Sequence, residues 1–188
     1  MSTLEERFIK AEEKIFSHSF RQNKGFEEAL YIFDYDPHQE LYVRERIDFI
    51  IKKSQSMDFT IKLFDLYDIV NHITIDKGFL KKNFSFESKR GLSYVNAAMN
   101  NMLRIKTPKN LVVKYLEENS DGCDAIFITG IGKVYPLFRA HYLLNSLQSI
   151  TNSTPVITFY PGSYDGMYLT LFSEIKDDNH YRAFKLID

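Results

Sequence analysis

Disulfides, a signal peptide and membrane spans are all missing from this sequence. Its 188 residues include one cysteine, Cys123, so no intramolecular disulfide can form, which is usual in a reducing compartment. Residues 1–7 lack the basic and then apolar order of a signal peptide, and no apolar run approaches the roughly 20 residues that span a bilayer. We therefore expect a cytoplasmic protein with no membrane contact.

A surplus of charge is missing too. The 24 Lys and Arg residues are balanced by 25 Asp and Glu, for a net charge of −1. A protein that grips nucleic acid unaided usually carries a basic surplus, so we expect no direct nucleic-acid binding by the chain alone. A local basic patch is still compatible with this balance. Tryptophan is absent, but 16 Phe and 12 Tyr suit both a core and half-wet interfaces.

Apolar runs and amphipathic segments alternate along the chain. The runs at 29–33, 60–64, 124–128 and 156–160 predict buried strands. Helices are predicted at residues 4–18, after Asp36, and at 67–73, 77–83, 92–104, 108–118 and 135–149. Two late extended runs, 169–175 and 181–187, flank a polar turn at 176–179 and predict a hairpin. The expected fold is a three-layer, largely parallel (Rossmann-like) sheet flanked by helices, with a C-terminal antiparallel β-hairpin, in one domain over residues 1–188.

Polar residues gather at the predicted strand ends, where ligands bind in such sheets. They are Asp34, Asp36, Asp65, Thr129, Gly130, Gly132, Lys133 and Asp165. One hypothesis makes them a pocket that holds Mg²⁺ through oxygen ligands. The other makes the acids helix caps and the glycines turn residues, and it is favoured because strand ends usually need both.

Familiar catalytic and cofactor motifs are not met. A phosphate loop needs Gly where Phe127 stands and Ser or Thr where Val134 stands. The five histidines are scattered without the spacing of a zinc site, and Ser163 lacks the second glycine of a nucleophile elbow. We expect no metal, no cofactor and no catalytic residues. Arg139 and His141 either clamp a partner's carboxylate or phosphate or pair with Asp124 or Asp165.

Four stretches together resemble one protein family. Residues 29–37 resemble its N-terminal YxFDYDP signature, and 128–139 resemble its central TGxGxxYPxxR stretch. Residues 155–166 resemble PxxxFYPGxYDG, and 179–184 resemble the closing NYYRAF, with His180 in place of an aromatic. In this order they identify the chain as a member of the BrxB family, part of the BREX systems by which bacteria exclude phage.

The resemblance implies partners rather than a reaction. It suggests that the chain works with other BREX proteins, which include a methyltransferase, a large ATPase and PglZ, a phosphatase-superfamily subunit. It carries over no activity and no catalytic residue.

Three functions remain open on the sequence. The first is a non-catalytic interaction subunit, with an interface formed by Tyr35, Tyr135, Arg139, Tyr160, Tyr164 and Arg182, since aromatic and Arg side chains anchor interfaces. The second is a Mg-dependent nucleotide-binding or phosphoryl-transfer protein that uses the strand-end Asp residues and the 129–133 loop. The third is a nucleic-acid contact through Lys133, Arg139 and Arg182, effective only inside a complex.

Overall fold

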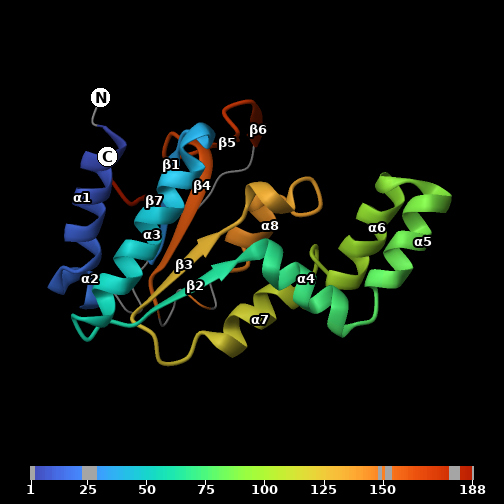
Figure 1. Cartoon of the computed structure of the whole chain (residues 1–188), viewed down its shortest axis with the longest axis horizontal. Helices are drawn as coiled ribbons and strands as arrows, with labels where there is room; N and C mark the ends of the chain where they lie inside the picture. Colours follow the sequence, from blue (N-terminus) through green and yellow to red (C-terminus); the bar gives the residue numbers. More distant parts are fainter. Residues whose placement is uncertain (1–2, 23–28, 148–149, 151–153, 178–182, 188) are drawn as a thin grey trace.

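The computed structural model describes residues 3–22, 29–147, 150, 154–177 and 183–187 (Figure 1). The helices are α1 Leu4–Ile15, α2 His18–Gln22, α3 Glu40–Gln55, α4 Leu66–Asp76, α5 Leu80–Arg90, α6 Leu92–Leu103, α7 Leu111–Asn119 and α8 Ala140–Leu144, with 3₁₀ turns η1 Pro37–Gln39 and η2 Gly132–Val134. The strands are β1 Leu30–Tyr35, β2 Ile61–Asp65, β3 Ala125–Thr129, β4 Val156–Tyr164, β5 Leu169–Leu171, β6 Ile175–Asp177 and β7 Phe184–Lys185.

The sheet has the parallel core that the alternating pattern predicts. Its strands lie in the order β2-β3-β4-β1-β7, and each neighbouring pair along this path is parallel. Beyond the parallel part, β4 pairs antiparallel with β5, and β5 with β6. The predicted α/β class, a helix-flanked and largely parallel sheet, is confirmed. Among the described residues, no helix combines the length and apolar character needed to cross a bilayer.

Helices cover both faces of the sheet because the strand side chains alternate between them. On β1, Tyr31 and Phe33 point to one face and pack with the buried residues of α1 and α3. Leu30 and Ile32 point to the other face and pack with α4, α6, α7 and α8. Each buried side chain of this size contributes roughly 1.5–3 kcal/mol relative to exposure, so the two clusters hold the layers together.

Strand β4 runs further than predicted. The apolar run at 156–160 predicted a strand that ends before Pro161 and Gly162, but the strand continues to Tyr164. Pairing with β3 ends at Thr158 and pairing with β5 begins at Gly162, so the missing N–H of Pro161 falls in the gap between two partners. The Pro161 carbonyl still accepts the backbone N–H of Phe172 (2.9 Å).

The helix predicted at 135–149 is wrong in length. Only residues 140–144 are helical within the described part of this segment, and 148–149 lie outside it. Pro136 has no N–H for a helical hydrogen bond, and the Leu137 carbonyl instead accepts the Asn100 side chain of α6 (2.9 Å). A contact from a distant helix thus replaces the local hydrogen bonding that the apolar spacing predicted.

The C-terminal antiparallel hairpin is present, but with other boundaries than we predicted. It is formed by β5 and β6 around residues 172–174, where Phe172 and Ser173 have positive φ. Of the turn predicted at 176–179, residues 176–177 belong to β6, and 178–179 lie outside the described residues. The later run pairs with β1 through β7, in parallel. Leu169 of the first run and Leu186 of the second are buried in different clusters on opposite faces of the sheet. The two runs therefore do not pair with each other as the two strands of one hairpin.

Candidate functional site

Asp34, near the carboxyl end of β1, joins three parts of the chain. The Arg7 guanidinium of α1 donates to the Asp34 backbone oxygen (2.7 Å) and to the carboxylate Oδ1 (2.6 Å). The other carboxylate oxygen, Oδ2, accepts the backbone N–H of Tyr164 (3.0 Å). Both oxygens are occupied by donors of the protein itself, so Asp34 ties α1 and the far end of β4 to β1.

Asp65, at the end of β2, organises the neighbouring loop in a similar way. Its Oδ1 accepts the Tyr67 backbone N–H (2.9 Å) and so caps α4, while Oδ2 pairs with the Lys133 ammonium (2.5 Å) and lies 3.5 Å from the Thr129 hydroxyl. Gly130 has φ +79°, and a Cβ there would lie 2.4 Å from Asp65 Oδ1. The structure therefore brings Asp65, Thr129, Gly130 and Lys133 together around one internal ion pair.

Of the remaining residues in the predicted strand-end cluster, Gly132 packs closely against the turn between β5 and β6, and the two acids serve local turns. A Cβ on Gly132 would lie 2.7 Å from the Phe172 ring. Asp36 caps η1 by accepting the His38 backbone N–H (2.9 Å), and this bond is the main reason that the pKa of Asp36 is lowered. Asp165 accepts the backbone N–H groups of Tyr168 and Met167, in that order the main causes that lower its pKa.

These contacts favour the capping hypothesis for the strand-end acids. Asp36 and Asp65 cap helical segments, as that hypothesis expects. A magnesium ion at Asp34 or Asp65 would have to displace Arg7 or Lys133. Across the residues that the structure describes, no group of three or more His, Cys, Asp or Glu side chains is placed to hold a metal ion.

Three tyrosines predicted at the interface are core residues, which corrects that part of the interface prediction. Tyr35, Tyr160 and Tyr164 are buried, each at most 5% exposed. The Tyr35 hydroxyl donates to Glu40, and the Tyr164 hydroxyl donates to Ala183 O (2.7 Å) and lies 3.0 Å from Gly166 O. Burial is the main cause that raises the pKa of all three phenols. Tyr160 and Tyr164 point inward because β4 continues as a buried strand to Tyr164, and Tyr35 is the buried last residue of β1.

The other interface residues have different environments. Tyr135 is half-buried against the core, and Arg139 is exposed. Arg182 and the His141 side chain lie outside the described residues. The Asp124 carboxylate accepts the Thr60 backbone N–H (2.9 Å), and within the described residues no ion pair joins Arg139 to an acid. Of the predicted contact residues with a described side chain, Arg139 is the one that faces solvent most fully.

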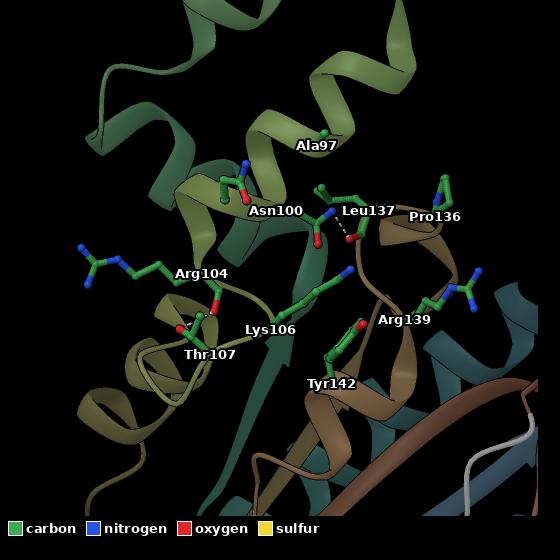
Figure 2. A pocket seen from close by; sticks show the side chains of 10 residues that line it. Ala97, Asn100, Arg104, Lys106, Thr107, Pro136, Leu137, Arg139 and Tyr142 are labelled. Carbon is green, nitrogen blue, oxygen red and sulfur yellow. Dashed lines mark hydrogen bonds between the residues drawn. The ribbon is translucent and has the colours of Figure 1, made fainter.

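Arg139 lines a pocket of about 560 Å³ that the sequence did not reveal (Figure 2). We call it the cationic groove. One side of the groove is the end of α6 with the loop that follows it, and the other side is the segment before α8 together with Tyr142 of α8. Its lining residues are Ala97, Asn100, Asn101, Arg104, Lys106, Thr107, Pro136, Leu137, Arg139 and Tyr142. Three are cationic and none is acidic. Beyond Arg104 a second pocket, of about 720 Å³, adds Lys109 and Lys114, with Glu117 as its acid.

Helices α5 and α6 form a hairpin that stands apart from the sheet (Figure 1), which we call the arm. Edge-on packing of Phe86 against Tyr94 (5.3 Å) helps to join its two helices. No residue of α5 is buried, and Phe84 is 64% and Leu92 60% exposed. The arm leads into the cationic groove, because α6 is part of the arm and its last residues line the groove. Exposed apolar groups of this size mark contact surfaces when they gather on one element.

The fold and these surfaces describe a helix-flanked α/β protein with an exposed arm and a cationic groove. No solved structure matches the chain significantly. The profile of the family described as "BREX protein BrxB" matches residues 62–186. A "BREX protein BrxB" of Bacillus cereus (strain H3081.97) is 43% identical over the full length of both chains. One of Escherichia coli O9:H4 (strain HS) is 28% identical over 98% of this chain and 92% of its own.

The chain therefore belongs to the BrxB family, as its four sequence motifs indicated. Membership makes it a component of a BREX antiviral defence system that works with other BREX proteins.

Proposed function

We propose that the protein is a non-catalytic interaction subunit of its BREX assembly. The exposed apolar surface of the arm is the observation that carries this proposal, because α5 buries no residue and Phe84 and Leu92 face solvent. Such side chains are stabilised by burial against a partner, at roughly 25 cal/mol per Å² of apolar area removed from water. The contacts of Asp34 and Asp65 support the same proposal, since both carboxylates are used inside the fold.

The partners in this proposal are other BREX proteins, with PglZ, the methyltransferase and the ATPase as the candidates. The same proposal takes residues 1–188 as one domain and places the protein in the cytoplasm. The alternative of a Mg-dependent nucleotide-binding or phosphoryl-transfer protein is less favoured, since its proposed metal ligands Asp34 and Asp65 are engaged with Arg7 and Lys133.

Pull-downs from cells that carry the native operon test the proposal. We expect the Phe84→Glu and Leu92→Glu variants to recover no BREX protein in the pull-down, because each substitution places a charge on the arm's apolar surface. Leu41→Glu is the matched control, since Leu41 is 73% exposed on α3, which covers the face opposite to α4 and α6. A tagged wild-type chain that recovers no BREX protein, or equal recovery by arm and control variants, would contradict the proposal.

A further inference from the structure

We propose that the cationic groove binds an acidic, partly apolar segment of a partner protein. This inference rests on the proposed function and names the chemistry of the partner. Arg104, Lys106 and Arg139 line one cavity without a carboxylate among its ten lining residues. None of the three has an ion-pair partner among the described residues, whereas Arg7, Arg44 and Arg46 each pair with an acid.

Packing within the fold accounts for only part of this arrangement. Arg104 follows the last residue of α6, where a cation is stabilised by the negative end of the helix dipole. The Lys106 ammonium lies 5.7 Å from the centre of the Tyr142 ring, a weak contact for a charge exposed to solvent. Arg139 has no comparable partner in the described part of the chain. Cations held along one cavity repel each other, and an anionic ligand relieves this repulsion.

The directions of the three side chains favour an extended ligand. Lys106 reaches into the middle of the groove, and Arg104 and Arg139 extend on opposite sides of it (Figure 2). They do not converge on one point, as a clamp for a single phosphate would. In the adjoining pocket Lys109 continues the row, whereas Lys114 is paired with Glu118 (3.5 Å) and Glu117 is the acid of that pocket. A segment with several spaced negative charges matches this row.

The lining favours a peptide over a nucleic-acid strand. The Asn100 amide already donates to Asn96 O (3.0 Å) and Leu137 O (2.9 Å), so it is not available to read base edges. Lys106 contacts the ring of Tyr142, the aromatic residue on which a base would stack. Leu137 and Pro136 offer apolar contact to side chains such as Leu, and the net charge of −1 is not that of a nucleic-acid-binding protein.

Photo-crosslinking identifies the ligand directly. The exposed groove residue Asn101 is replaced by a photo-crosslinking amino acid in cells that carry the native operon, and the crosslinked product is mapped by mass spectrometry. A crosslink to a segment of a BREX protein rich in Asp and Glu supports the inference. A crosslink to nucleic acid, a crosslink to a neutral or basic segment, or the lack of any crosslink to a BREX protein overturns it.

Charge removal gives an independent test in the same cells. Lys106→Gln with Arg139→Gln should reduce affinity for the recovered partner at least about tenfold. Lys10→Gln with Lys52→Gln is the matched control, because both lysines are exposed on the helices of the other face. All four side chains are exposed, so folding is preserved, and thermal melts check this. Equal affinity of both double variants overturns the groove as the site. If the arm variants still abolish recovery in that case, the proposed function stands without this inference.

Discussion

Arg7 and Asp34 illustrate how single residues are used at the strand ends. Their side chains are each 20% exposed, and the Asp34 carboxylate also accepts the Tyr164 N–H. Asp34→Ala removes the carboxylate that pairs with the largely buried Arg7 guanidinium and leaves the Tyr164 N–H without its acceptor, while Arg7 keeps its bond to the backbone oxygen of residue 34. We expect the free energy of unfolding to fall by about 3 kcal/mol. Urea unfolding measures this change.

The control for Asp34→Ala is Glu118→Ala. Glu118 pairs with Lys114 at 3.5 Å on the surface, with both side chains more than half exposed. An exposed pair of this kind contributes at most about 0.5 kcal/mol. Similar losses in the two variants would mean that the Arg7–Asp34 pair does not hold the strand ends together.

The buried tyrosines make the stability of the fold depend on pH in the alkaline range. Burial raises the pKa of Tyr35, Tyr160 and Tyr164 above the value of about 10 in an unfolded chain. The unfolded state therefore loses these protons first, so their contribution is complete below about pH 10 and is lost as pH rises above it. We expect Tyr160→Phe to make the fall in melting temperature above about pH 10 shallower. Wild type and variant with the same alkaline slope would contradict this.

At the scale of elements, the length of β4 depends on Gly162. Its φ is +151°, and a Cβ there would lie 2.0 Å from the Thr170 carbonyl oxygen on β5. Because that atom belongs to the backbone of a paired strand, Gly162→Ala forces the two strands apart. We expect a loss of about 2–4 kcal/mol in the free energy of unfolding, measured by chemical denaturation.

Gly78→Ala separates the effect of backbone conformation from that of the clash. Gly78 has φ +65°, and a Cβ at this position would have no neighbouring atom within 4 Å. The left-handed backbone is then the sole source of strain in this variant, and it costs about 1–2 kcal/mol. If Gly162→Ala costs no more than Gly78→Ala, close packing of β4 on β5 is not what requires glycine.

The sequence predicts correctly those helices and strands whose bounds are set by the residues of one segment, and not those set by contacts with distant segments. The strands at 30–35 and 125–129 follow from apolar runs ended by polar residues. Helix α1 begins with a capping box made by Thr3 and Glu6, which is also a local pattern of the sequence. The helix expected from residue 135 begins only at residue 140, because Pro136 lacks an N–H and the Leu137 carbonyl accepts the Asn100 side chain of α6. The burial of Tyr164 was missed because a proline and a glycine inside a strand look like its end.

The candidate site was predictable only in part for the same reason. Asp65 and Lys133 were assigned to one sheet edge from the topology of parallel strands, and they form an ion pair there. The cationic groove combines residues 97–107 with 136–142, and no rule of spacing joins these segments. Arg104, Lys106 and Lys109 within six residues were the available signal, since three cations in one loop indicate a local patch inside a neutral sum.

At the scale of the whole molecule, the arm and the groove offer two kinds of contact to one assembly. The arm presents apolar side chains such as Phe84, and the groove presents Lys106 and Arg139. Salt separates them, because the screening length falls from about 10 Å at 0.1 M to about 3 Å at 1 M, while apolar burial is not screened. The complex with the recovered BREX partner should therefore weaken as sodium chloride is added.

The variants should divide this salt dependence between the two surfaces. Lys106→Gln with Arg139→Gln should bind more weakly at low salt and lose most of the slope of affinity against salt, because the exposed ionic contacts are gone. Phe84→Glu should also bind more weakly but keep the slope, since the groove is unchanged. Affinity of the purified complex, measured by calorimetry across a salt series, decides the matter. A slope that survives in the groove variant would place the ionic contacts elsewhere on the molecule, and a slope lost in Phe84→Glu would mean that the arm and the groove do not act as separate surfaces.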